Sequence, residues 1–350
     1  MNNIDGSYLE GGGQIVRTAL GISTLLGKAV SIEKIRAGRS EPGLKAQHLT
    51  AIKAMEQLCN AYGDDAVLGS TKINYVPGKL KGRTLSLDIG TAGSITLLMQ
   101  SLLLPLAFSG EKFRLKITGG TDVAWSPSWD YFCEIIVPQF RRYADITCKL
   151  EQRGYYPKGA GKVDIQINSH TTLDDAKKSV PLSLTEQHHL IHIKGIAHAS
   201  STLQDAQVSE RMARGAKVAL GQKVVCPINI TAEYVNTPSD GCGITLWAIF
   251  SKDKNDIDAK NPIRLGADVL GEKGKRAEEV GSDCAQKLLA EIQSSAAVDQ
   301  HLADTLIPLL GLLGGEIKTS EITNHTKTNV FVVEQMVGKK IEIDGKTIHA

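Results

Sequence analysis

The chain has 350 residues, of which 42% are hydrophobic and 22% charged, and its formal net charge is +2. That length exceeds one ordinary domain core, so the sequence predicts two domains or one domain with an insertion. The composition is that of a globular protein. The low net charge excludes a polycationic surface, so any contact with nucleic acid must come from local basic clusters.

Cysteine spacing and apolar runs indicate the compartment. The six cysteines are scattered without a CxxC spacing, which predicts reduced thiols and a cytoplasmic protein, or a nuclear one in a eukaryote. The N-terminus has no basic segment followed by an apolar one, so no signal peptide is expected. The longest apolar run, residues 97–108, is interrupted by Gln100, Ser101 and Pro105 and is too short to span a bilayer. We therefore expect no membrane association.

A glycine-rich turn opens the first predicted helix. Glu10 and three glycines precede apolar residues that recur at helical spacing over 15–26, and Gln14 and Arg17 lie in the first turn. Backbone N–H groups at such a helix start can bind an anion, and Glu10 can hold a divalent ion that bridges phosphates. The alternative is a plain turn in which Glu10 is only a helix-start carboxylate.

A strand over 29–35 and a helix starting at residue 44 and reaching about 62 come next. Four polar residues lie between these elements or in the first turns of the helix: Arg36, Arg39, Gln47 and His48. Two guanidinium groups at a strand end suit a terminal phosphate. A surface salt-bridge pair is the alternative, but Gln47 and His48 favour an anion pocket.

The same order of elements returns twice. Helices are predicted over 94–108, 127–143 and 302–313, and strands over 113–117 and 317–322. Two further strands close each copy: 72–76 with 84–89, 146–151 with 162–167, and 340–343 with 347–349, the last pair joined by an Asp-Gly turn. The interval from the terminating glycine to the last strand isoleucine is nearly constant. The sequence therefore predicts an α/β (α+β) protein of three β-α-β-α-β-β repeats.

A separate pattern interrupts the third copy. A strand is predicted over 190–197, a helix over 204–220 and strands over 228–234 and 243–250, followed by an exposed polar loop over 252–260. This β-α-β-β order is sufficient for a small inserted domain. We assign residues 1–183 plus 276–350 to a large three-repeat domain and residues 184–275 to an inserted small α/β domain.

The repeats place three polar groups at equivalent strand-to-helix corners, where α/β units usually bind ligands. These groups are Arg36 with Arg39, Thr121 with Asp122, and His325. A histidine among threonines and asparagines is usually structural, yet an imidazole can attack phosphorus and form a phosphoramidate. The spacing alone leaves both interpretations of His325 open.

Other residues carry weaker signals. His188, His189 and His192 have no further ligands at metal spacing, so exposed strand positions are favoured over a metal site. Three aromatic residues could stack on a base or pack in the core: Trp125, Trp129 and Tyr131.

Taken together, these motifs resemble the RNA 3'-terminal-phosphate cyclases. The resemblance is carried by six ordered blocks: Glu10 to Arg17, Ile35 to Arg39 with Pro42-Gly43 and Gln47-His48, Gly90 to Gln100, Gly119 to Asp122, Arg153 to Gly161, and His325 with Thr328-Asn329 and Val332 to Glu334. The blocks cover nearly the whole chain. The resemblance implies a large domain of three repeats with a small inserted domain, in agreement with the repeat pattern.

The resemblance also implies a reaction and its cofactors. His325 would attack the α-phosphorus of ATP and hold AMP, with help from a divalent metal, Mg²⁺ or Mn²⁺. AMP would pass to the 3'-terminal phosphate of an RNA, and the neighbouring 2'-hydroxyl would displace it to close a 2',3'-cyclic phosphate. Activation by AMP is chemically reasonable, because a free phosphate offers only a poor leaving group.

Each implied role falls on residues of this sequence. Glu10 would hold the metal, and His325 would be the nucleophile. The ATP site would comprise Arg17, Gln100, Pro127, Tyr131, Asp304 and Thr305. The RNA phosphate would be bound by Arg36, Arg39, Gln47 and His48.

Two departures from the family pattern concern single positions. Ala160 stands where the middle glycine of a three-glycine signature is usual, which matters if that position has a positive φ. Thr305 is at the expected adenine edge, and His301 stands where an aromatic residue is common. Nucleotide preference is therefore less well defined than the reaction.

One alternative keeps the fold but not the reaction: a non-catalytic cyclase-like protein of ribosome biogenesis that binds RNA or a partner. Such relatives lack the histidine and the phosphate-binding residues, which are present here. A transferase of three-carbon units with a related repeat architecture would not explain His325. The sequence does not define the oligomeric state.

Overall fold

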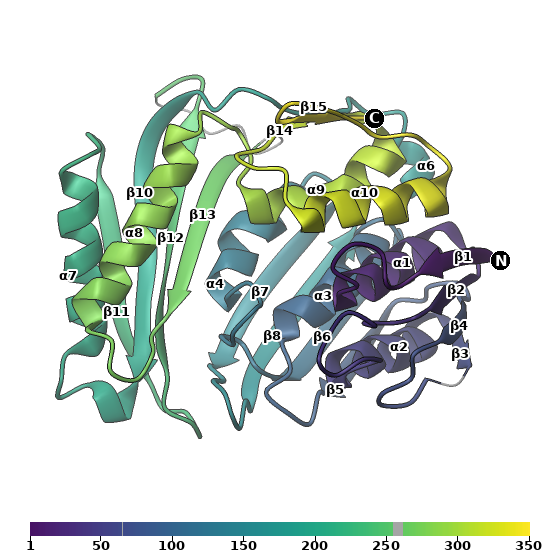
Figure 1. The fold of residues 1–350 in the computed structure, drawn as a ribbon, viewed down its shortest axis with the longest axis horizontal. Coiled ribbons are helices and arrows are strands. Elements are labelled where there is room, and N and C mark those ends of the chain that lie inside the picture. Colours follow the sequence, from purple (N-terminus) through teal and green to yellow (C-terminus); the bar gives the residue numbers. More distant parts are fainter. Residues whose placement is uncertain (65, 255–261) are drawn as a thin grey trace.

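The structure, a computed structural model, describes residues 1–64, 66–254 and 262–350. The described residues form four sheets of four strands each (Figure 1). Three of these sheets share one topology: the first two strands are parallel, the fourth is antiparallel beside the second, and the third forms the edge. The prediction of three β-α-β-α-β-β repeats is therefore confirmed.

The elements of the repeats follow one another along the chain. The first repeat contains β1 (Asn2–Asp5), α1 (Gly13–Leu26), β2 (Val30–Glu33), α2 (Ala46–Cys59), β3 (Tyr62–Asp64) and β4 (Ile73–Val76). The second contains β5 (Arg83–Asp88), α3 (Ile95–Ala107), β6 (Lys112–Gly119), a broken helix, β7 (Ala144–Gln152) and β8 (Gly161–Ser169). After the short α6 (Leu173–Ala176), the third contains β9 (Leu182–Leu184), α9 (Gln300–Leu313), β14 (Gly315–Lys318), α10 (Asn324–Val337), β15 (Glu342–Asp344) and β16 (Thr347–His349).

One predicted strand pair was wrong. Residues 84–89 were expected to close the first repeat beside 72–76, but β5 opens the second sheet and pairs with β6 in parallel. The partner of β4 is β3, which has only three residues and includes Gly63. A strand this short shows no hydrophobic periodicity, and the helix expected to reach residue 62 ends at Cys59, before Asn60 in the left-handed conformation.

The second helix of the second repeat is not continuous. The sequence predicts one helix over 127–143, but the structure divides it into α4 (Trp129–Tyr131), the π-helical turn η1 (Phe132–Ile136) and α5 (Val137–Phe140). The N–H of Val137 donates to the carbonyl oxygen of Phe132, five residues earlier. Pro138 has no N–H and interrupts the regular ladder here.

The fourth sheet lies within the third repeat, between β9 and α9. It contains β10 (His189–Ser200), β11 (Ile228–Val235), β12 (Cys242–Ser251) and β13 (Ile263–Leu270), with the short η2 (Ser201–Leu203) and α7 (Val208–Gly221) after β10 and α8 (Ala277–Gln293) after β13. α7 and α8 pack against each other and against this sheet (Figure 1). The sequence missed β13 and α8. The polar loop expected at 252–260 lies mostly outside the described residues.

The packing of α8 bears on the domain division, which stays a prediction. Residues 276–350 were assigned to the large domain, yet α8 packs on α7, β12 and β13. These contacts indicate that α8 belongs with the inserted sheet and that the insertion ends after Gln293. The inserted sheet also contacts the second repeat through α4 and η1. A Cβ at Gly266 of β13 would lie 2.7 Å from the ring of Tyr131, so a glycine is required for this close approach.

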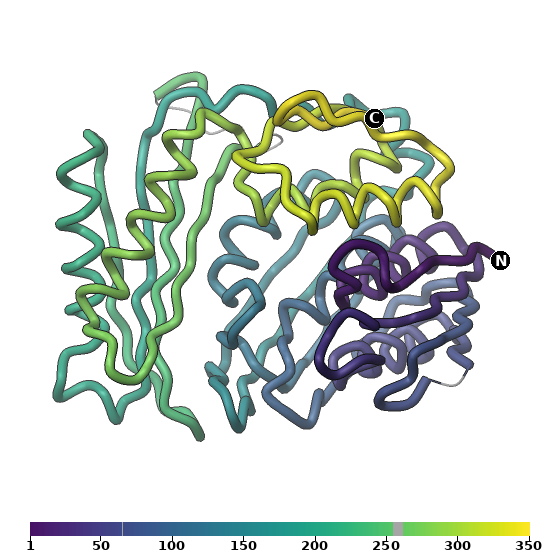
Figure 2. The backbone as a smooth tube through the Cα atoms, viewed as in Figure 1, coloured from purple at the N-terminus to yellow at the C-terminus, as the bar shows by residue number. Residues whose placement is uncertain are grey.

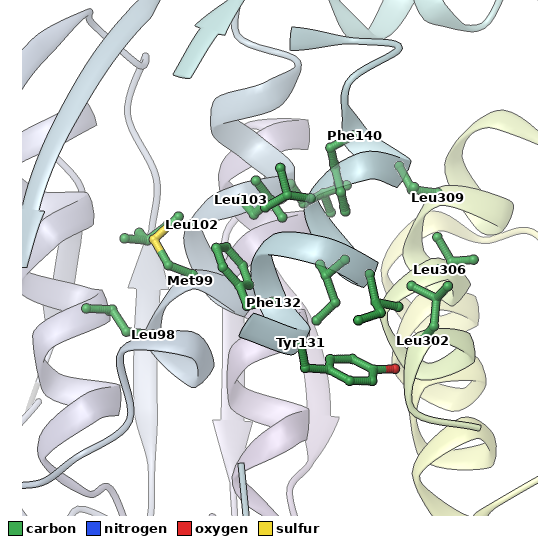
Figure 3. Close-up of a cluster of buried hydrophobic side chains, with 14 of the residues drawn as sticks. Leu98, Met99, Leu102, Leu103, Tyr131, Phe132, Phe140, Leu302, Leu306 and Leu309 are labelled. Atoms are coloured by element: carbon green, nitrogen blue, oxygen red, sulfur yellow. The ribbon is translucent and has the colours of Figure 1, made fainter. Parts of the chain in front are cut away.

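Helices of different repeats form one core. α1 packs against α3 and α10, and α10 packs against α9. The backbone trace shows the C-terminal helix beside the N-terminal segment (Figure 2). Buried leucines of α3 and α9 meet aromatic residues of the broken helix, including Phe132 and Phe140 (Figure 3). This apolar cluster holds the helices in place, so that the polar residues in the first turns of α1 and α10 lie close to each other.

The segment 153–161 anchors the corner that follows β6. Arg153 is 1% exposed and its guanidinium binds the carboxylates of Asp122, Asp130 and Glu233. Further along this segment Ala160 has a φ of +57°, in the left-handed region that disfavours a β-carbon. The alanine in the family signature is therefore a strained substitution.

The described residues contain neither a disulfide nor a membrane-spanning helix. All six cysteines are free, as the sequence predicted. Within the described ranges no helix combines the length and the apolar character that crossing a membrane requires.

We expect Ala160→Gly to raise the free energy of unfolding by about 1 kcal/mol. A left-handed φ costs an L-residue roughly 1–2 kcal/mol, and the greater freedom of glycine in the unfolded chain reduces the gain. Urea denaturation measures the change. The matched control is Ala206→Gly in an exposed turn whose φ is not positive, which should be destabilising. Two effects of the same sign would contradict the strain at residue 160.

Candidate active site

A cavity of about 480 Å³ lies between α1, α3, the broken helix, α9 and α10. This volume is typical of small-molecule sites. It brings together seven residues that the sequence singled out: Arg17, Gln100, Pro127, Tyr131, Asp304, Thr305 and His325. The remaining five, Glu10, Arg36, Arg39, Gln47 and His48, do not line the cavity but lie in and around the first turns of α1 and α2.

His325 is the second residue of α10, whose start is capped by Thr323. The amide nitrogen of Gln14 donates to the carbonyl oxygen of His325 over 2.8 Å, and the Gln14 Oε1 faces Nδ1 of the same residue. Because Oε1 can only accept, this network assigns the proton to Nδ1. Nε2 therefore carries the free electron pair.

The surroundings of His325 keep the imidazole neutral. Burial lowers its pKa below the ordinary 6.5, and the positive charges of Arg17 and Arg39 add to the effect against the carboxylate of Glu10. Glu10 Oε2 lies 3.4 Å from Nε2 and 3.1 Å from the guanidinium of Arg39. A neutral imidazole with a free Nε2 is the form that can act as a nucleophile.

Three arginines lie at the start of α1 with little compensating charge. Arg17 donates to Gln100 Oε1 over 2.9 Å, and burial together with Arg36 lowers its pKa to about 10. Arg36 has a φ of +57°, and its Nε is buried without a hydrogen-bond partner in the described part of the chain. Arg39 forms an ion pair with Glu10, whereas no ion pair joins Arg17 or Arg36 to any described residue. Their unpaired donors suit a polyanionic ligand.

His48 lies beneath the glycine turn. The ring is 1% exposed, its Nδ1 accepts from the Lys45 N–H over 3.0 Å, and Nε2 has no partner among the described residues. Burial and nearby cations lower the pKa of His48 to about 3, so it stays neutral. A β-carbon on Gly13 would lie 2.4 Å from this Nε2, which explains a glycine there. Gln47, one residue earlier, faces Gly93.

Asp304 of α9 is tied to α10 at the opposite side of the cavity. Its carboxylate accepts from the Thr326 hydroxyl over 2.9 Å, and its carbonyl oxygen accepts from the Asn329 amide over 2.6 Å. Burial raises the pKa of Asp304 to about 7. The neighbouring Thr305 has a buried hydroxyl without a hydrogen-bond partner in the described ranges. These groups offer hydrogen bonds to a ligand.

The three aromatic candidates have different environments. Tyr131 lines the cavity with its ring, but its hydroxyl donates to Asp299 over 2.5 Å and is not free for a ligand. Trp129 is buried in the core, whereas Trp125 is 99% exposed at the cavity. Only the Tyr131 ring and Trp125 can therefore contact a bound molecule.

Some cavity residues had no assigned role in the sequence. Gln14 was noted only as part of a helix start, and its contact with His325 spans 311 positions. Asp268 of β13 and Lys287 of α8 also line the cavity. Both come from elements that the sequence did not predict, and neither belongs to a motif that would single it out.

A nucleotide and a divalent ion fit these residues. Glu10 is a partly exposed carboxylate paired with Arg39, and Mg²⁺ commonly binds one or two carboxylates together with phosphates and water. The buried, unpartnered Thr305 hydroxyl and the cavity volume suit a nucleoside. Thr121 and Asp122, expected at the equivalent corner, are instead buried against Arg153 and do not line the cavity.

Comparison with known proteins agrees with this arrangement. A family model described as RNA 3'-terminal phosphate cyclase matches residues 8–343. The chain is 43% identical over 344 residues to the protein of that name from Pyrococcus furiosus, over 98% of this chain and 95% of that one. It is 40% identical over 352 residues to the Archaeoglobus fulgidus protein of the same name, over 99% of both chains.

The fold and the cavity define an α/β protein of three like repeats with a small-molecule site where helices of all three repeats meet. The chain belongs to the RNA 3'-terminal phosphate cyclase family, as its motifs indicated.

We expect Gly13→Ala to lower the free energy of unfolding by about 1–3 kcal/mol, because the added methyl group collides with the buried His48 ring. In a His48→Ala background the same substitution should cost much less, since the ring is gone. Urea denaturation of the four variants gives the coupling free energy. Additive effects would contradict the contact.

Proposed function

We propose that this enzyme of the RNA 3'-terminal phosphate cyclase family uses ATP to convert an RNA 3'-terminal phosphate to a 2',3'-cyclic phosphate through AMP bound to His325. The observation that carries the proposal is the free Nε2 of His325, oriented by Gln14 and facing Glu10. The relatives named as RNA 3'-terminal phosphate cyclases support the overall activity. The covalent route is our inference from the site.

In the first step, Nε2 attacks the α-phosphorus of ATP, an N–P bond forms and pyrophosphate leaves. The proton stays on His325 Nδ1 and is donated to Gln14 Oε1 in a hydrogen bond, so the positive charge that develops on the ring is stabilised. Arg17 and Gln100 would bind the phosphates, whose negative charge would balance a guanidinium that forms no ion pair within the described residues. Glu10 would hold the Mg²⁺ or Mn²⁺ that offsets the remaining phosphate charge.

In the second step, an oxygen of the RNA 3'-phosphate attacks the phosphorus of the bound AMP, and the N–P bond to His325 breaks. In the third, the 2'-hydroxyl attacks the RNA phosphorus, loses its proton and expels AMP. Arg36 and Arg39 would bind the RNA phosphate, with Gln47 and the unpartnered Nε2 of His48 beside them. Because the ion pair between Arg39 and Glu10 is exposed, the guanidinium of Arg39 can leave Glu10 and bind this phosphate instead.

The nucleoside would occupy the inner part of the cavity. Pro127 and the Tyr131 ring would contact the adenine, the unpartnered hydroxyl of Thr305 would bind its edge, and Asp304 would bind the ribose. Because Asp304 has a pKa of about 7, it can accept or donate a hydrogen bond near neutral pH.

We expect wild-type protein incubated with α-labelled ATP and Mg²⁺ or Mn²⁺ to retain acid-labile, base-stable label after denaturation, as a phosphoramidate should. His325→Ala should retain none, because the attacking nitrogen is removed. The matched control is His349→Ala, which removes an exposed histidine from β16. Absence of label in the wild type would favour the non-catalytic alternative, and equal labelling of His325→Ala would exclude this nucleophile.

Arg39→Ala should reduce cyclisation of a 3'-phosphorylated RNA more than it reduces labelling by ATP. The reason is that Arg39 lies on the Glu10 side, outside the cavity lining. Rates of labelling and of cyclic phosphate formation, measured on the same preparation, test this split. Equal loss of both steps would contradict a role on the RNA side. Arg17→Ala, by contrast, should reduce labelling, and cyclisation should fall with it because it depends on the first step.

A further inference from the structure

A second group of metal-ligating side chains lies outside the cavity. Asp122 follows β6, Asp130 belongs to α4 and His198 belongs to β10 of the inserted sheet. These residues are 2%, 6% and 0% exposed, and one potential ligand atom from each lies within 4.8 Å of the others. The group therefore joins the large domain to the inserted sheet.

Two of these ligand atoms have no hydrogen-bond partner. Asp122 Oδ1 and His198 Nε2 are both buried, and no described residue donates to or accepts from either. They face each other over 3.5 Å. That distance is longer than a normal N–H···O hydrogen bond of ~2.7–3.2 Å. It is close to the edge of a tetrahedron with bonds of ~2.1 Å, which is about 3.4 Å.

The second polar atom of each of the three side chains makes a hydrogen bond. These bonds orient Asp122 Oδ1 and His198 Nε2 toward the centre of the group. Asp122 Oδ2 accepts from the Thr121 hydroxyl over 2.7 Å and from Arg153 over 3.1 Å. Asp130 Oδ2 accepts from Arg153 over 2.8 Å. His198 Nδ1 is 2.8 Å from the Tyr155 hydroxyl. Metal-bound histidines usually hold their second ring nitrogen in such a hydrogen bond.

The charges around the group leave room for a cation. Three carboxylates, those of Asp122, Asp130 and Glu233, face the single guanidinium of Arg153, a formal excess of two negative charges. A divalent cation would balance the excess.

We propose that Asp122, Asp130 and His198 bind a divalent cation of the zinc type. One imidazole nitrogen and two carboxylate oxygens form a donor set that suits Zn²⁺, and they leave a fourth position open to water. This site is separate from Glu10, which would hold the ion that accompanies ATP. Its ligands come from both parts of the chain, so the ion links β10 to the corner after β6.

The ion would affect the nucleotide cavity by fixing the position of the residues that form one of its walls. Asp130 immediately precedes Tyr131, whose ring lines the cavity, and Asp122 lies three residues before the exposed Trp125. Fixing Asp122 and Asp130 to His198 would hold this wall against the inserted sheet. The ion would touch neither ATP nor RNA, so its role is structural.

The test uses the full-length protein, stripped with a chelator and then dialysed against Zn²⁺ with no nucleotide present. We expect one bound Zn²⁺ per chain by metal analysis, a higher thermal midpoint than that of the stripped protein, and the intense visible absorption of tetrahedral sites when Co²⁺ replaces Zn²⁺. Glu10→Gln should retain all three properties. His198→Asn should lose them.

A milder variant covers the case in which His198→Asn fails to fold. Tyr155→Phe removes only the hydroxyl beside His198 Nδ1 and should weaken Zn²⁺ binding by roughly 10–100-fold. Stripped wild-type protein that binds no Zn²⁺ would overturn the proposal. So would Zn²⁺ binding that survives in a folded His198→Asn variant or that is lost in Glu10→Gln. In those cases Asp122 and His198 form only a long polar contact.

Discussion

The contact between Gln14 and His325 is the interaction on which the candidate site depends. The two residues come from the first turns of α1 and α10, in the first and third repeats, and they meet because these helices pack together. The Thr18 hydroxyl strengthens the same junction by donating to Asn329 over 2.8 Å. A single glutamine thus sets the tautomer of the imidazole, its orientation and the side from which it can be approached.

The three repeats use the same corner for three kinds of chemistry. The first corner carries Arg36 and Arg39, an excess of positive charge. The second carries Asp122, which belongs to an excess of negative charge around Arg153. The third leads into His325, a neutral group. An internally repeated fold can therefore carry opposite charges at equivalent corners, because each corner belongs to its own sheet.

Sequence periodicity was sufficient to predict the three repeats but not the short strands at the edges of their sheets. Long alternating strands such as β6 and β8 were predicted, whereas β3 was missed because three residues have no period. The motifs brought His325 and the cavity residues into one hypothesis, and the geometry brings seven of them together around one cavity. The contact with Gln14 and the contribution of Lys287 depend on packing between distant elements, which no local pattern encodes.

The position of the insertion has a consequence for biosynthesis. β9 pairs in parallel with β14, Leu182 opposite Gly315, yet residues 185–314 must be made before the partner strand exists. The first two repeats can pair their strands early, while β9 waits through the whole inserted sheet. His325 belongs to the third repeat, so its contact with Gln14 of the first repeat can form only after the inserted sheet has been synthesised. A chain that stops before α10 could fold its early repeats and still leave the cavity without the wall that α10 supplies.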